Sequence, residues 1–133
     1  MDYEIITTQN IKDERGKLVV FLRGGDLPIT EKQFGQIYFV TFKDKNIVRG
    51  NHYHKEWEEY FGIVNGRVKA VLEDINTKER VTIILDALDK DYLRLRIGVN
   101  IAHSFQSETD SACILNYTIK EWSPNDTFSY KLL

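Results

Sequence analysis

Short runs rich in Val, Ile, Tyr, Phe and Thr recur along the whole chain, and they constrain its fold more than any other feature. Nowhere does an apolar period of 3.6 residues persist for three turns, so long helices are not predicted. The runs lie at residues 3–8, 17–22, 36–42, 59–64, 67–73, 80–85, 93–97, 112–119 and 128–132. This many short strands with almost no helix predicts an all-β sandwich or jelly-roll barrel.

Turn signals separate the predicted strands. The dipeptide Asn65-Gly66 lies between two apolar runs, and both residues tolerate the positive φ angles of a type I′ turn. We therefore predict an antiparallel hairpin at this point. A short helical turn is expected only at residues 28–34. A length of 133 residues fits one domain, so residues 1–133 are expected to form a single domain.

Composition and charge exclude several classes of function. The chain has 18 Lys and Arg against 20 Asp and Glu, so no basic excess indicates a nucleic-acid partner. Its apolar runs are too short to cross a bilayer, and the first residues lack the order of a signal peptide. The one cysteine, Cys113, excludes an intrachain disulfide and is expected to be buried and inert. These features predict a soluble, cytoplasmic protein that binds neither nucleic acid nor membrane.

Two of the three histidines form a closely spaced pair. Strand alternation places His52 and His54 on one face and Tyr53 on the other. Four residues separate His54 from Glu59, and six residues separate Glu59 from Gly66. This spacing is close to the first motif of the cupins, in which HxH is followed by E and G. Glu59 is placed to satisfy an inward-facing imidazole.

The third histidine, His103, stands where the second cupin motif has its histidine, although the other residues of that motif are absent. Three imidazoles and a carboxylate allow two kinds of chemistry. They form a ligand set for a divalent Zn, Fe, Mn or Ni ion, with His52, His54, Glu59 and His103 as ligands. Alternatively, an imidazole that titrates near neutrality acts as a general base beside a ketone. Spacing alone does not separate these from histidines that only line a barrel.

Residues 49–55 carry the most specific resemblance. Their sequence, RGNHYHK, resembles the RGxHxH segment of nucleotide-sugar 3,4-ketoisomerases, and its first five residues resemble the RGxHY segment of dTDP-4-dehydrorhamnose 3,5-epimerases. Residues 13–18, 36–40 and 101–105 are similar to further segments of these cupin families. The resemblance implies a cupin jelly roll, or double-stranded β-helix, that is usually a homodimer and acts on a sugar attached to a nucleoside diphosphate.

The resemblance also implies roles for individual residues. His52 matches the catalytic base of both families, and His54 matches the second ketoisomerase histidine. Tyr38 matches a tyrosine of the ketoisomerase pocket, and Arg49 matches an arginine that meets the sugar nucleotide. Tyr117 is similar in position to the acid tyrosine of the epimerases. Glu59 and His103 are expected to complete the substrate site.

Two departures from the family patterns keep other functions open. The 3,5-epimerases carry a lysine where Glu59 stands, and a carboxylate opposes the negative charge of an enolate. The acidic, tyrosine-rich ending of the ketoisomerases is not reproduced at residues 122–126. A non-catalytic sugar-binding protein therefore remains an alternative.

The sequence as a whole predicts an isomerase or epimerase of a nucleotide-linked 4-keto-6-deoxysugar, working in surface polysaccharide biosynthesis. Proton abstraction beside the ketone requires no cofactor. The alternatives are the metal-binding cupin and the non-catalytic sugar-binding protein.

Overall fold

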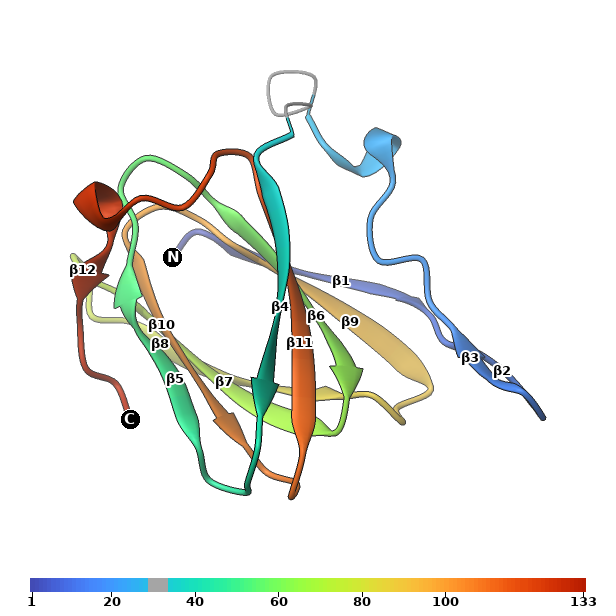
Figure 1. Cartoon of the computed structure of the whole chain (residues 1–133). Helices are drawn as coiled ribbons and strands as arrows, with labels where there is room; N and C mark the ends of the chain where they lie inside the picture. The colour runs from blue at the N-terminus through green and yellow to red at the C-terminus, as the bar shows by residue number, and fades with distance from the viewer. Residues whose placement is uncertain (29–33) are drawn as a thin grey trace.

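Strands dominate the structure, a computed structural model that describes residues 1–28 and 34–133 (Figure 1). Within these residues the helices are two single 3-10 turns, η1 (Gly24–Asp26) and η3 (Pro124–Asp126). The helical turn expected at residues 28–34 falls mainly on 29–33, which lie outside the described residues. None of the helices in the described part of the chain has the length and apolar character needed to span a membrane.

Two five-stranded antiparallel sheets form the barrel. The first sheet runs in the order β1 (Tyr3–Gln9), β9 (Asp91–Ile97), β6 (Glu59–Asn65), β11 (Ala112–Thr118) and β4 (Gln36–Phe42). The second runs in the order β12 (Phe128–Ser129), β5 (Val48–Tyr53), β10 (Ile101–Ser107), β7 (Arg67–Asp74) and β8 (Arg80–Asp86). A separate two-stranded ribbon of β2 (Ile11–Asp13) and β3 (Gly16–Leu18) extends away from the barrel (Figure 1).

Alternating side chains of the two sheets meet in one apolar core. Phe61 of β6, Leu95 of β9 and Ile114 of β11 pack in one buried cluster with Leu72 of β7 and Phe105 of β10. Burial of each such side chain contributes about 1.5–3 kcal/mol to folding. The predicted all-β jelly roll is therefore confirmed, and the residues that point between the sheets are those that build the site.

The predicted hairpin at Asn65-Gly66 is wrong. β6 pairs with β9 and β11, whereas β7 pairs with β8 and β10, so the two strands belong to different sheets. Gly66 has a positive φ angle of 76°, but Asn65 does not, so the type I′ turn is not formed. A Cβ atom on Gly66 would collide with the Ser111 carbonyl oxygen. The glycine therefore turns a corner between the sheets beneath the 109–111 turn.

Other sequence expectations differ from the structure in smaller ways. The run at 17–22 forms a strand only up to Leu18, and the run at 128–132 only up to Ser129. β2, β5 and β10 are not among the predicted runs, because polar residues interrupt their apolar pattern. Cys113 is half-buried rather than buried, and burial raises the pKa of its thiol, which keeps it protonated.

Candidate active site

A β-bulge in β5 sets the direction of the side chains on which the site is built. His103 of β10 lies opposite His52, but the next residue, Ser104, lies opposite Gly50. Asn51 is therefore the extra residue of the bulge. Gly50 and Asn51 have positive φ angles of 98° and 57°. Bulges of this kind change the direction of side chains and are over-represented beside active sites.

The bulge brings Arg49 and His52 to the same side of β5, although they are three residues apart. In a regular strand, residues separated by three positions point to opposite faces. Here both side chains line one cavity. Gly50 allows the close approach of β5 to β10, because a Cβ atom there would lie 2.9 Å from the carbonyl oxygen of His103.

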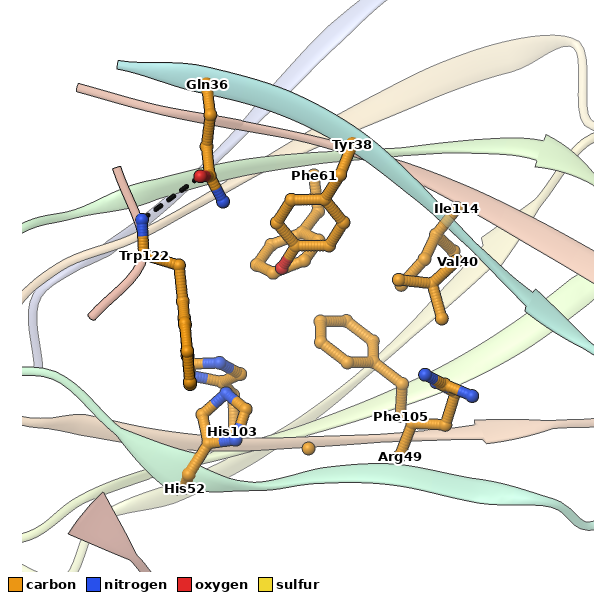
Figure 2. A pocket seen from close by; sticks show the side chains of 11 residues that line it. Gln36, Tyr38, Val40, Arg49, His52, Phe61, His103, Phe105, Ile114 and Trp122 are labelled. Carbon is orange, nitrogen blue, oxygen red and sulfur yellow. Dashed lines mark hydrogen bonds between the residues drawn. The ribbon is translucent and has the colours of Figure 1, made fainter. Parts of the chain in front are cut away.

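This cavity has a volume of about 450 Å³ and lies inside the barrel. That volume suits a small organic ligand. Four of the predicted site residues line it, namely Tyr38, Arg49, His52 and His103 (Figure 2). The other lining residues are Gln36, Val40, Gly50, Phe61, Phe105, Ile114 and Trp122.

His52 lines the cavity, and its surroundings favour the neutral form of its imidazole. Burial, together with the nearby imidazole of His103, lowers the pKa of His52 from its ordinary value to about 4. Its ring lies edge-on to the His103 ring, with the centroids 4.7 Å apart. A histidine with this pKa is neutral near pH 7, which is the protonation state that a general base requires.

His54 does not line the cavity but lies behind it. Its ring is buried, stacks on Trp57 with centroids 4.4 Å apart, and lies 5.0 Å from the His52 ring. Nδ1 of His54 lies 2.6 Å from the backbone oxygen of Asp126. A carbonyl oxygen only accepts, so Nδ1 carries a proton and donates it. Burial lowers the pKa of His54.

Glu59 lies between His54 and His103. One of its oxygens, Oε2, is 3.0 Å from Nε2 of His103 and 3.5 Å from Nε2 of His54. The other, Oε1, accepts a hydrogen bond from the Asn116 amide at 3.3 Å. Burial opposes ionisation of Glu59, but its neighbours, His103 first, hold the pKa of the carboxyl below its ordinary value.

The three facing atoms of this cluster need a positive charge or a proton among them. Nδ1 of His103 lies 3.1 Å from the Ile101 carbonyl oxygen, so it too carries a proton. Both Nε2 atoms would then present lone pairs to an ionised carboxylate. Within residues 1–28 and 34–133, neither Nε2 nor the Glu59 Oε2 atom makes a well-directed hydrogen bond. Either an imidazolium or a bound cation resolves this repulsion.

Tyr38, on β4, supplies a hydroxyl donor to the cavity. Its hydroxyl points into the cavity from the side opposite His52 and His103 (Figure 2). Burial, with the negative charge of Glu59, raises the pKa of Tyr38 above its ordinary value. The phenol therefore stays protonated and is able to donate to an oxygen of a ligand.

The structure does not bring Tyr117 to the cavity. On β11, Ile114 lines the cavity and Asn116 reaches Glu59, so these even-numbered residues point inward. Tyr117 points to the outer face of the first sheet, where its ring lies 5.9 Å from that of Tyr60. The sheet therefore lies between the Tyr117 side chain and the cavity that His52 lines.

Several residues of the site escape the sequence analysis. Trp122 lies at the cavity with 52% of its surface exposed, and its backbone N–H donates to the Gln36 side-chain oxygen at 3.1 Å (Figure 2). Asn116 and Asp126 hold Glu59 and His54 from distant parts of the chain. Residues 123–126, Ser-Pro-Asn-Asp, have the composition of a turn, but nothing in them indicates the partner histidine.

Comparison with known proteins places the chain in a family. The profile of the family described as WxcM-like, C-terminal (FdtA) matches residues 1–131. The chain belongs to this family. A relative of this WxcM-like protein in Aneurinibacillus thermoaerophilus is named TDP-4-oxo-6-deoxy-alpha-D-glucose-3,4-oxoisomerase. The two are 26% identical over 115 residues, which cover 86% of this chain and 76% of the relative.

Solved structures agree with this assignment. QdtA, a sugar 3,4-ketoisomerase from Thermoanaerobacterium thermosaccharolyticum solved with TDP, matches with a TM-score of 0.77 and 25% identity, covering 95% of this chain and 86% of QdtA. The 3,5-epimerase RmlC from Legionella pneumophila matches with a TM-score of 0.81 and 25% identity, covering 98% of this chain and 73% of RmlC. The predicted resemblance of the WxcM-like protein to both enzyme groups, and its cupin jelly roll, are confirmed.

Proposed function

We propose that this WxcM-like protein is an isomerase of a nucleotide-linked 4-keto-6-deoxysugar, and specifically a 3,4-ketoisomerase. The observation that carries the proposal is the placement of the His52 imidazole in a cavity that also holds Arg49 and Tyr38, where burial lowers the pKa of His52. The relatives named as 3,4-oxoisomerase and 3,4-ketoisomerase support it. The outward position of Tyr117 favours the ketoisomerase over the epimerase, because the tyrosine that matches the acid of the epimerases does not reach the cavity.

The reaction needs one base and one site for negative charge. His52 takes the proton from C3, the electrons of the C3–H bond form a C3=C4 double bond, and the ketone oxygen at C4 becomes an oxyanion. The Tyr38 hydroxyl and the Arg49 guanidinium stabilise this charge. The His52 imidazolium returns the proton to C4, while the C3 hydroxyl proton passes to the C4 oxygen. The ketone then stands at C3.

The remaining polar residues support the base. His103 packs edge-on against His52, and the Glu59 carboxylate lies 3.0 Å from Nε2 of His103. The carboxylate also favours the imidazolium that forms on His52 during the reaction. His54 is placed with Glu59 rather than with the sugar, so we give the proton return to His52 itself. We also propose that the protein works in the cytoplasm, in surface polysaccharide biosynthesis. Its single free cysteine suits a reducing compartment.

Incubation with dTDP-4-keto-6-deoxyglucose in D₂O tests this proposal directly. We expect the 3-keto product, with deuterium at C4 of the product and at C3 of the remaining substrate to the extent that the His52 imidazolium exchanges its proton with solvent before returning it. Deuterium at both C3 and C5, without a 3-keto product, would instead identify an epimerase. No product and no exchange would reject catalysis and leave a sugar-binding protein.

The lowered pKa of His52 predicts an unusual acid limit for the reaction. The base is lost when pH falls through its pKa, so a pKa of about 4 leaves the enzyme active at pH 5 to 6. An ordinary histidine, with a pKa of about 6.5, would lose most activity in that range. The pH profile of kcat/KM, measured with the folded state checked by circular dichroism, distinguishes the two. An acid limb centred near 6.5 would contradict the proposed state of His52.

A second candidate function is the binding of a divalent metal ion by the histidine cluster. One ligand atom from each of His52, His54, Glu59 and His103 lies within 4.8 Å of the others. Three of these residues have buried atoms that lack a well-directed hydrogen bond within the described residues. Such a donor set suits Zn²⁺ and similar ions.

Elemental analysis of purified protein tests whether the cluster binds a metal ion. The metal candidate predicts about one equivalent of a divalent metal, lost in Glu59→Gln and retained in Glu58→Gln, whose side chain lies on the other face of the sheet and pairs with Arg96. Protein that turns over the sugar nucleotide and contains no stoichiometric metal removes this candidate.

We also propose that the protein is a homodimer that pairs through the outer face of β4. Ile37 and Phe39 point outward there and are 57% and 69% exposed, and Val64 of β6 is exposed on the same sheet. Large apolar side chains exposed on an edge strand favour pairing with another chain. A second copy supplies the same apolar surface in a two-fold contact.

A charge placed on this face is expected to separate the dimer. Phe39→Lys would bury a charge in the contact, so sedimentation should change from twice the chain mass of 15.6 kDa to a single chain. Val99→Lys, at an exposed residue in the turn between β9 and β10, is the matched control and should stay dimeric. A monomeric wild-type protein would refute the dimer.

A further inference from the structure

Asn51, the extra residue of the bulge, binds the segment 130–133, which we call the strap. Its Oδ1 atom accepts the backbone N–H groups of Leu132 at 2.8 Å and Leu133 at 3.2 Å. Its Nδ2 atom donates to the Leu133 carbonyl at 3.1 Å. The Asn51 carbonyl accepts the backbone N–H of Tyr130 at 2.8 Å. The side chain and backbone of one residue therefore make four hydrogen bonds to the strap.

The strap is also held at the outer face of the second sheet. The Leu132 side chain is buried there and packs in a small cluster with Val71 and Ala102. The Tyr130 hydroxyl donates to Glu73 of β7 at 2.5 Å. These contacts do not involve Asn51, so the strap has its own attachment to β7 and β10.

β12 leads directly into the strap, and both segments lie along β5. Phe128 of β12 pairs with Tyr53, and Ser129 pairs with His52. The opposite edge of β5 pairs with β10. The bulge is therefore enclosed between β10 on one side and the segment 128–133 on the other.

Left-handed backbone is less favourable at asparagine than at glycine, and it persists where the surroundings hold it. Asn51 has this conformation, and it separates Arg49 from His52. The strap is the structural element that binds the Asn51 side chain. Relaxation of the bulge would restore regular alternation and turn Arg49 and His52 to opposite faces.

We infer that Asn51 and the strap form a positioning device that fixes the direction of His52 relative to Arg49 in the catalytic cavity. This inference rests on the proposed function of His52 as the base. It assigns Asn51 the part of a positioning residue, because its side chain points to the strap and not to the substrate cavity. Leu132 supports the same positioning of His52, because it fixes the strap to Val71 and Ala102.

Asn51→Gly tests the inference, because glycine permits the positive φ angle but removes the side-chain hydrogen bonds. We expect kcat to fall by about tenfold to a hundredfold, since a shift of about 1 Å in a catalytic group has this effect. The affinity for TDP should stay unchanged, because Arg49 pairs with Phe105 in regular register before the bulge. Asn51→Asp keeps the acceptor for both N–H groups but places an acceptor against the Leu133 carbonyl, so it should recover only part of the rate.

Two further variants make the test independent of Asn51. Leu132→Ala releases the strap from Val71 and Ala102 and should lower kcat in the same way. Asn46→Gly is the matched control, because Asn46 also has a positive φ angle, of 70°, but lies beside Ser107 at the far end of β10. Its kcat should equal that of the wild type.

The imidazole NMR signals of His52 give a readout that does not depend on turnover. They should shift in Asn51→Gly and Leu132→Ala and stay in place in Asn46→Gly. Wild-type kcat and unshifted His52 signals in Asn51→Gly would overturn the inference, even if its melting temperature falls. A wild-type protein without turnover would instead refute the proposed function, and the NMR signals would still decide whether the strap positions His52.

Discussion

His52→Asn is expected to lower kcat by about a hundredfold to ten-thousandfold, the range that a positioned general base contributes. Asparagine has a similar size and polarity but cannot accept the C3 proton. Because His52 lines the cavity without being a large part of the apolar core, the fold should remain. Single-turnover assays with dTDP-4-keto-6-deoxyglucose measure the loss, and the melting temperature and TDP affinity should stay close to those of the wild type.

Tyr117→Phe is the matched comparison for this variant. Tyr117 is the other proton-transfer candidate that the sequence suggests, but its side chain faces the outer surface of the first sheet. Removing its hydroxyl should leave kcat within about twofold of the wild type, a change of less than 1 kcal/mol in the barrier. Undiminished turnover in His52→Asn, or a loss in Tyr117→Phe as large as that in His52→Asn, would contradict the proposed assignment.

Gly50→Ala is expected to reduce both stability and activity. The φ angle of 98° at Gly50 costs a residue with a side chain about 1–3 kcal/mol. The new Cβ atom would also lie 2.9 Å from the His103 carbonyl oxygen, so β5 and β10 must separate. That movement carries His103 away from His52, and a displacement of about 1 Å lowers the rate about a hundredfold. Urea unfolding and steady-state kinetics measure the two effects.

Gly16→Ala separates the backbone cost from the collision. Gly16 has a φ angle of 133°, but a Cβ atom there would meet nothing within 4 Å, and the residue lies in the β2–β3 ribbon. We expect it to lose stability from the φ angle alone and to keep its kcat. A Gly50→Ala protein as active as Gly16→Ala would show that the approach of β5 to β10 does not set the site.

Much of the fold can be predicted from the sequence because strands leave a local signal. The apolar runs at 36–42, 59–64 and 67–73 correspond to β4, β6 and β7 almost residue for residue. The pairing of these strands leaves no such signal. Asn65-Gly66 has the composition of a hairpin turn, but its glycine is used for a corner, because the loops that pack on it come from residues 86–89 and 107–111.

The site divides in the same way. The HxH spacing correctly brings His52 and His54 to one side, and the distant His103 joins them. Plain alternation fails at Asn51, because a bulge depends on the facing strand and on the strap rather than on local sequence. Asn116 and Asp126, which contact Glu59 and His54, likewise come from segments more than fifty residues away.

The corner at Gly66 has a consequence for how the chain acquires its structure. Strands that follow one another in the sequence mostly do not pair. β1 pairs with β9, β6 pairs with β9 and β11, and β5 pairs with β10 and β12. Each of these pairings must close a long loop before any contact compensates for the lost chain entropy. A ribosome-bound chain would therefore hold β4, β5 and β6 without their partners until β9 to β12 emerge. Slow folding is the result expected of this topology.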